Sequence, residues 1–211
     1  MIAGVDGTPG GWVVAVVASR ADVRWHRAGS ADEVVELTAG CVAVGVDMPL
    51  RPPVTGYRAC DVRARELLGA ARSSMFFAPV EAVLDCVTYA EACAVSRAAH
   101  GKAISKQAWH LVPKIREWRR ELPATVLEVH PETTFRVLDP RVVDSKRSAR
   151  GVAQRLIALR AFVDVPEVLA DLPAGPSVDD VLDALAAAWS ADRWAAGRSE
   201  SLGEPPALIE V

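Results

Sequence analysis

The sequence predicts an α/β fold: a mixed five-stranded sheet with helices on both faces and a helical insert. Three observations support this fold class. Short apolar runs of the kind that form buried strands occupy residues 2–6, 11–18 and 41–49. Apolar residues recur at helical spacing near the end of the chain, over 178–197. Residues 51–122 carry no strand pattern and lie between strand-like segments, as expected of an insert.

Composition limits the class of protein. The chain has 211 residues, 51% of them hydrophobic and 24% charged, which suits one globular domain with an insert. Residues 51–122 hold twelve Lys/Arg and seven Asp/Glu, a net charge of +5, whereas the whole chain has a net charge of −3. A basic insert in an acidic body is compatible with an anionic partner and equally with a solvated helical surface.

Cysteine usage and hydropathy predict a location. The four cysteines form no C-x-x-C pair, so we expect reduced thiols and no cysteine-bound zinc. No export signal is evident and no apolar stretch reaches about 18 residues, so we expect a cytoplasmic protein with no membrane partner. The sequence leaves the oligomeric state open, a homodimer included.

The first part of the chain predicts a meander followed by a parallel strand. Residues 2–6 and 11–18 form strands joined by a Thr-Pro-Gly-Gly turn, and 22–27 form a third. Ser30 with Glu33 three residues later is a capping signal for a helix over 31–39. Because that helix precedes it, the strand within 41–49 should run parallel to the first.

The remainder of the chain predicts mainly helices. The insert is expected to contain helices near 58–70, 79–98 and 105–121. After the insert we expect a strand over 124–130 and a helix over 148–162. A loop with one short turn over 163–178 and a helix over 178–197 should follow. The segment PPALIEV at the end gives no prediction. The resulting order, βββαβ, insert, βα and a closing helix, is that of a ribonuclease H-like domain, and residues 1–211 are predicted to form one such domain.

Acidic residues stand at the ends of the predicted strands and on the closing helix. Asp6 ends the first strand, Asp47 ends the fourth, Glu128 lies in the fifth, and Asp180 and Asp183 share one helix face. In this topology they converge at one edge of the sheet. Each also has a structural interpretation, since Asp6 and Asp47 can initiate turns and Asp180 can favour a helix N-terminus. Glu128 is harder to explain structurally, because a Glu between Leu and Val is costly to bury unpaired.

Convergent carboxylates favour metal-dependent chemistry. Close like charges raise one another's pKa, and a bound divalent cation removes that penalty. Carboxylate oxygens suit Mg²⁺ or Mn²⁺, and two such ions about 3.5–4 Å apart can contact the attacking and leaving oxygens of a phosphodiester. We therefore expect a metal-dependent nuclease or phosphodiesterase acting on nucleic acid or a small phosphodiester. The expected metal ligands are Asp6, Asp47, Asp180 and Asp183, and the expected catalytic residues are Asp6, Asp47, Glu128 and Asp183.

Basic and polar residues supply candidates for substrate binding. The expected phosphate ligands are Arg58, Arg65, Lys114, His130 and Lys146. Arg58, Arg65 and Arg72 are spaced by seven and share a helix face, which can hold phosphates or can form salt bridges to Asp61. His130 can contact phosphate or can bond to a neighbour at the strand end. Lys114 and Lys146 are candidates on charge alone.

Several segments carry a family resemblance. They are GVDGTPGGW, VGVDMP, RACDVRARELLG, SSMFFAP, LEVHPETTF and DDVLDALAAAWSA. They resemble the family called domain of unknown function 429, a set of predicted nucleases of ribonuclease H-like fold, over about residues 2–196. The family pattern also includes Arg58, Asp61, Arg65, Ser74, Lys114, His130, Glu132 and Lys146, all present here.

The closing helix carries a second resemblance. Its D-x-x-D-A-L-A form at 180–186 resembles the last motif of Holliday-junction resolvases of the RuvC type. In those resolvases two acids on the last helix close a metal site begun by an Asp on the first strand and a Glu on the fourth. This chain has Asp47 at the fourth strand, which is shorter by one methylene.

Two other functions remain open from sequence. D-G-T-P-G-G also resembles the first phosphate loop of sugar kinases and actin-like ATPases, which would indicate a phosphotransferase. That reading expects a second similar hairpin and a second lobe, which the sequence does not contain. The other alternative is a non-catalytic protein of the same fold that binds a ligand or nucleic acid and uses the acids for a structural metal.

Overall fold

The computed structural model describes all 211 residues, and the chain divides into two compact units. The sheet unit comprises Met1–Met48, Leu122–Glu200 and Glu210–Val211, and the insert unit comprises Pro49–Glu121 and Ser201–Ile209. The strands of the sheet unit are β1 (Ile2–Thr8), β2 (Gly11–Ser19), β3 (Asp22–Ala28), β4 (Ala43–Val46) and β5 (Val126–Glu128). Its helices are α1 (Ala31–Leu37), α5 (Pro131–Leu138), α6 (Ala149–Leu159), α7 (Val165–Ala170) and α8 (Val178–Ala195).

The five strands form one mixed sheet in the order β3-β2-β1-β4-β5. β2 runs antiparallel to both of its neighbours, while β1, β4 and β5 are parallel. The α/β class and the five-stranded mixed sheet predicted from sequence are therefore confirmed. Val5 pairs with Val46 across β1 and β4, so Asp6 and Asp47 each follow one member of the same pair.

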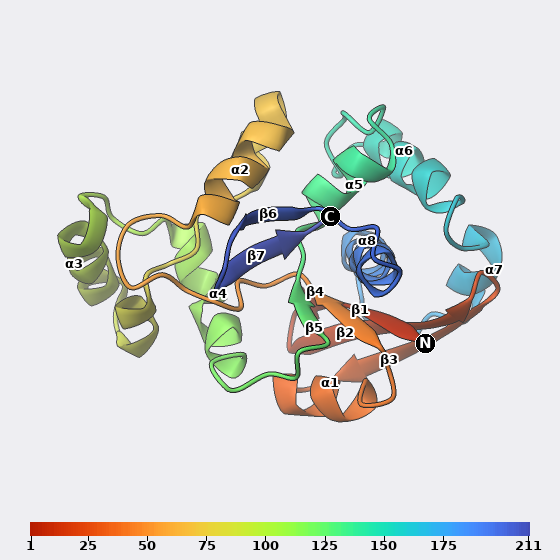
Figure 1. Ribbon diagram of the computed structural model, residues 1–211, viewed down its shortest axis with the longest axis horizontal. Helices are drawn as coiled ribbons and strands as arrows, with labels where there is room; N and C mark the ends of the chain where they lie inside the picture. Colours follow the sequence, from red (N-terminus) through yellow and green to blue (C-terminus); the bar gives the residue numbers. More distant parts are fainter. The chain divides into compact units, whose positions relative to one another are not determined.

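Helix α8 covers one face of the sheet and forms the centre of the core. It packs against β1, β2 and β4, and Figure 1 shows it on the opposite side of the sheet from α1. Ala184, Leu185 and Ala188 are completely buried and belong to the same apolar cluster as Val13 and Ala15 of β2. α8 begins at a capping box, since the Ser177 hydroxyl accepts from the Asp180 amide and the Asp180 carboxylate accepts from the Ser177 amide.

Glycines on β1 and β4 allow α8 to approach the sheet at backbone distance. A Cβ on Gly4 would lie 1.9 Å from the Ala184 carbonyl oxygen, and one on Gly45 would lie 2.3 Å from the Ala187 carbonyl oxygen. Gly4 and Gly45 are paired in register on adjacent strands. Together they form a flat strip on which only a helix backbone with small side chains fits, which explains the run Ala-Leu-Ala-Ala-Ala in α8.

The insert unit contains three helices, two 3₁₀ turns and a hairpin. These are α2 (Ala59–Leu68), η1 (Gly69–Ser74), η2 (Glu81–Asp85), α3 (Tyr89–His100), α4 (Lys106–Glu117), β6 (Ser201–Glu204) and β7 (Ala207–Glu210). A buried ion pair between Arg58 and Asp61, 2.5 Å apart, stands at the start of α2. The Asp61 carboxylate also accepts the Ala78 amide at 3.0 Å, which ties the chain after η1 to α2. None of the helices of the chain is long and apolar enough to cross a membrane.

The structure differs from the sequence-based elements in three places. The segment expected to be one helix over 79–98 is broken into η2 and α3, because the Thr88 hydroxyl accepts the Glu91 amide and starts a new helix. The strand expected over 124–130 ends at Glu128, and α5 follows it directly with Pro131 in its first turn. The C-terminal segment, for which no structure was predicted, forms the β6–β7 hairpin.

Adding one methyl group at Gly45 tests the close contact between sheet and helix. Gly45→Ala should lower the free energy of unfolding by about 1–3 kcal/mol or more, because the new Cβ meets backbone that cannot move aside cheaply. Gly40→Ala is the matched control, since its Cβ would meet nothing closer than the Met1 methyl at 3.9 Å. Urea unfolding measures both variants. Equal stability of the two would contradict this account of the core.

Candidate functional site

Two acidic residues lie side by side where β1 and β4 end. Asp6 is 8% exposed, and alternation along β1 places its side chain on the same face as Gly4, the face that α8 covers. Its Oδ1 accepts the Gly7 amide at 2.8 Å. Asp47 directly follows β4, and its amide donates to the Val5 carbonyl at 3.0 Å. The charge of Asp183 on α8 acts strongly on the Asp47 carboxylate, which places the two close together.

The third acid comes from α8. Asp183 is 3% exposed and precedes Ala184, the residue whose carbonyl oxygen contacts Gly4. The packing of helix on sheet therefore carries the Asp183 carboxylate to the ends of β1 and β4, where Asp6 and Asp47 lie. We call Asp6, Asp47 and Asp183 the acid cluster.

Burial raises the pKa of every member of the acid cluster, and repulsion by the other members adds to the rise for Asp6 and Asp47. Burial raises the pKa of Asp6 well above its usual range, and the charges of Asp47, Asp183 and Asp180 add to this rise. Burial, followed by the charge of Asp183, raises the pKa of Asp47 to about 8. Burial also raises the pKa of Asp183 to about 6, although the ammonium of Lys146 opposes the rise. Closely packed buried carboxylates of this kind call for a compensating cation.

A lysine supplies part of that compensation. Lys146 Nζ lies 2.5 Å from Asp183 Oδ2, and the lysine side chain is 35% exposed. Burial alone would lower the pKa of Lys146, but the charge and hydrogen bond of Asp183, followed by the charges of Asp47 and Asp6, raise it above its ordinary value. Lys146 was expected from sequence to bind phosphate, and the structure places its ammonium in the acid cluster.

Two buried oxygen atoms at this end of the sheet have no hydrogen-bond partner. One is Asp183 Oδ1, the carboxylate oxygen that does not contact Lys146. The other is the hydroxyl of Thr8, which follows Asp6 by two residues on β1 and so shares its face. Buried polar atoms are nearly always paired in native proteins, so unpaired ones next to a charge cluster point to a missing ligand.

A buried ion pair lies next to the acid cluster. Arg155 on α6, 2% exposed, donates to both oxygens of Glu132 on α5, at 2.9 and 2.7 Å. Its guanidinium also lies 5.3 Å from the centre of the Phe135 ring. The charge of Glu132 raises the pKa of Asp183 and that of Arg155 lowers it. No role was predicted for Arg155, although an arginine on the apolar face of a helix is a signal for a buried pair.

The other predicted acids lie differently from the acid cluster. Asp180 is engaged in the capping box of α8, although its charge also raises the pKa of Asp6. Glu128 is paired in register with Val46, so its side chain lies on the sheet face opposite to that of Gly45. Its charge still raises the pKa of Asp47, after that of Asp183. His130 is the N-cap residue of α5 and is half-buried.

Three of the predicted phosphate ligands belong to the insert unit. Arg58 is buried and forms a salt bridge with Asp61. This salt bridge is the alternative to phosphate binding that the sequence left open for Arg58. Arg65 donates to the backbone carbonyls of Arg72 and Met75, so its guanidinium closes the turn after α2. Lys114 lies half-buried on α4.

The glycine-rich stretch after Asp6 forms a tight hairpin. Thr8 pairs with Gly11, and Pro9 with Gly10 forms the turn between them, with a φ of 79° at Gly10 that favours glycine. The Gly7 amide is already donated to Asp6. It is therefore not free to contribute to a phosphate cradle of the sugar-kinase type.

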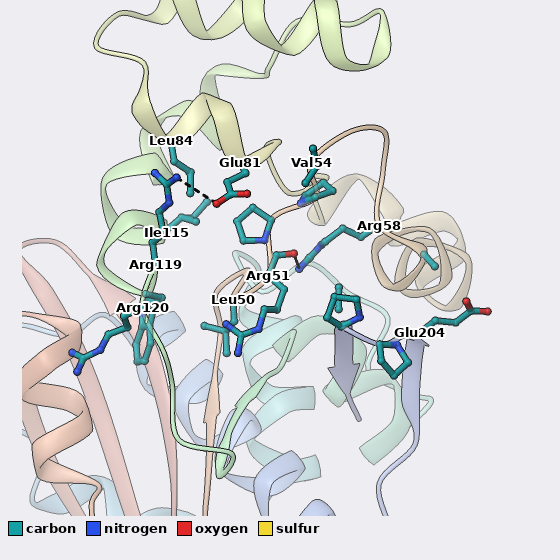
Figure 2. A pocket seen from close by; sticks show the side chains of 17 residues that line it. Leu50, Arg51, Val54, Arg58, Glu81, Leu84, Ile115, Arg119, Arg120 and Glu204 are labelled. Carbon is teal, nitrogen blue, oxygen red and sulfur yellow. Dashed lines mark hydrogen bonds and ion pairs between the residues drawn. The ribbon is translucent and has the colours of Figure 1, made fainter.

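A separate pocket of about 590 Å³ lies within the insert unit. Figure 2 shows its walls, which come from the Leu50–Val54 segment, the start of α2, η2, α4 and the β6–β7 turn. Its walls are mainly apolar, and two of its arginines are ion-paired: Arg58 with Asp61, and Arg119 with Glu81 at 3.3 Å. The pocket does not bring together side chains of like charge, as the acid cluster does. The acid cluster is therefore the stronger candidate for a catalytic site.

Comparison with known proteins places the chain in a family. The family model described as protein of unknown function, DUF429, matches residues 4–208. The chain belongs to this family. The DUF429 match spans Asp6 on β1, Asp47 directly after β4, the insert, and Asp183 on α8. No curated protein and no solved structure matches the chain.

The raised pKa values predict that this DUF429 protein, without metal, loses stability as pH rises. The folded protein retains protons on Asp47 that the unfolded chain has released, between about pH 4, the usual Asp pKa, and about pH 8. The contribution of Asp47 to stability is therefore greatest below this window and falls as pH rises through it. Asp47→Asn should remove much of this fall and raise the melting temperature at pH 8 by a few degrees, since 1 kcal/mol corresponds to about 2–4 °C here.

Thermal melts in EDTA from pH 4 to pH 8 measure this effect. Asp179→Asn, on the first turn of α8 and outside the acid cluster, should melt like the wild type at every pH. A wild type whose melting temperature rises steadily to pH 8, with no gain from Asp47→Asn, would refute the assignment.

Proposed function

We propose that this protein is a divalent-cation-dependent phosphodiesterase of the nuclease type, with a ribonuclease H-like fold. The observation that carries the proposal is the acid cluster, in which the buried carboxylates of Asp6 on β1 and Asp183 on α8 and the half-buried carboxylate of Asp47 after β4 meet a single ammonium. A purely structural role would more economically use apolar side chains at this place, since buried charges are costly even when paired.

The donor set fits a hard divalent cation. The acid cluster offers carboxylate oxygens and no sulfur ligand, which suits Mg²⁺ or Mn²⁺. Asp183 Oδ1 is buried without a hydrogen-bond partner, so it is available to a metal ion. Asp6, Asp47 and Asp183 would hold the ion. When bound, such an ion supplies positive charge that stabilises the transition state of phosphodiester hydrolysis.

The chain's own residues would prepare this site for an anionic substrate. The close packing of α8 holds the acid cluster in place, and the pair of Glu132 and Arg155 keeps a further charge beside it neutralised. The Thr8 hydroxyl, unpaired and on the face of Asp6, can donate to a substrate oxygen. Substrate is expected to be nucleic acid or a smaller phosphodiester.

The topology supports the finer fold assignment. In the order β3-β2-β1-β4-β5 only β2 is antiparallel to the others, and a helix at the end of the chain crosses β1 and β4. This is the arrangement expected of a ribonuclease H-like domain, in which acids on the first and fourth strands and on the last helix meet. The positions of Asp6, Asp47 and Asp183 agree with that scheme.

Hydrolysis assays test the proposed function. Branched DNA, RNA–DNA hybrid, single strands and a generic phosphodiester are incubated with the full chain and Mn²⁺. Asp6→Asn and Asp183→Asn should each lower the rate at least about 100-fold, since a metal ion contributes several kcal/mol and each 1.4 kcal/mol is about tenfold.

Asp179→Asn lies on the same helix outside the acid cluster and should keep the wild-type rate. Activity that is unchanged in the Asp6 and Asp183 variants would exclude metal-dependent hydrolysis at this site. Stabilisation of the wild type by Mn²⁺ with no turnover on any of these substrates would favour the non-catalytic alternative.

A further inference from the structure

Lys146 occupies a position in the acid cluster that a cation would otherwise fill. Its Nζ lies 2.5 Å from Asp183 Oδ2, and the charges of Asp47 and Asp6 also act on it. It is not buried under the cluster, because its side chain is 35% exposed and so can be reached by a substrate. An ammonium at this place supplies positive charge to the same group of carboxylates that a metal ion would bind.

The two carboxylate oxygens of Asp183 differ in their hydrogen bonding. Oδ2 accepts from Lys146, whereas Oδ1 is buried and has no hydrogen-bond partner. In a site for two metal ions, a shared carboxylate commonly offers one oxygen to each ion. Here one of the two oxygens is already committed to the ammonium, which leaves one for a metal.

The charges also balance for a single divalent ion. The acid cluster carries three negative charges when ionised, and Lys146 reduces this to a net of two. The neighbouring Glu132 and Arg155 cancel one another. For the acid cluster and Lys146 taken by themselves, one divalent cation neutralises the remainder, whereas two would leave a net of two positive charges. Asp180 and Glu128 add negative charge near Asp6 and Asp47.

The backbone around Lys146 is held firmly against α6. Gln154 Oε1 accepts the amides of Val143 and Asp144, at 3.2 and 3.0 Å, and Arg155 donates to the Asp144 carbonyl at 3.0 Å. A Cβ on Gly151 would lie only 2.0 Å from the Ser145 carbonyl oxygen, so the segment before Lys146 rests directly on the helix. The lysine is thus delivered to the acid cluster by a fixed loop.

We propose that the Lys146 ammonium takes the place of a second divalent ion, so that the acid cluster binds one ion and the lysine supplies the other positive charge for the substrate phosphate. This rests on the proposed function, because it takes the acid cluster to be a metal site. It replaces the two-ion arrangement that carboxylates alone predict, and it makes Lys146 a substrate-facing residue whose counterion is Asp183.

The number of bound ions tests this proposal. Isothermal titration calorimetry with MnCl₂ on the full chain should give one ion per wild-type chain. Lys146→Met, which keeps the length of the side chain without its charge, should bind two ions and show the spin coupling of adjacent Mn²⁺ ions in its electron paramagnetic resonance spectrum. Lys146→Arg, which keeps the charge, should bind one. Lys106→Met, on the first turn of α4, is the matched control and should also bind one.

The outcomes separate the two proposals. Two ions in the wild type, or one ion in a Lys146→Met protein with native circular dichroism, would overturn the role of Lys146 and leave the metal site intact. No binding in either protein would overturn both proposals. If Lys146→Met does not fold, a wild-type stoichiometry of two ions would still overturn the role of Lys146.

Discussion

The contact between the α8 backbone and the glycine strip of β1 and β4 is the constraint on which the rest of the structure depends. Gly4 and Gly45 leave no room for a side chain beneath Ala184 and Ala187. This contact fixes the height of α8 above the sheet and so fixes where Asp183, the residue before Ala184, meets the strand ends. A helix held farther from the sheet would leave Asp6 and Asp47 without the third carboxylate.

The electrostatics of the acid cluster explain why its three carboxylates need positive charge nearby. Burial raises the pKa values of Asp6, Asp47 and Asp183, and repulsion within the acid cluster adds to the rise for Asp6 and Asp47. The packing that creates the acid cluster therefore also makes it costly when ionised. Lys146 offsets part of this cost from a loop that is fastened to α6. The remaining negative charge is the physical basis for assigning the site to a divalent cation. Structure and proposed chemistry thus follow from the same close packing.

Sequence patterns predicted those residues of the site whose positions depend only on where a strand ends or which face of a helix they occupy. Strand ends and helix phase were enough to select Asp6, Asp47 and Asp183, and the structure brings these together. Tertiary contacts decided the rest. Glu128 lies on the opposite sheet face because its register with Val46 is set by strand pairing. The ion partners of Lys146 and Arg155 lie 37 and 23 residues away in sequence, beyond the reach of any periodicity. Helix α5 was missed because its Pro-Glu-Thr-Thr start has little helix propensity and is stabilised by packing.

The central claim is that the acid cluster is a divalent-cation site, and anomalous diffraction from a crystal soaked in Mn²⁺ tests it most directly. The account predicts a manganese peak within coordination distance of Asp6, Asp47 and Asp183 Oδ1, with Lys146 still bonded to Asp183 Oδ2. A crystal at neutral or alkaline pH with saturating Mn²⁺ and no anomalous peak at these carboxylates would contradict it.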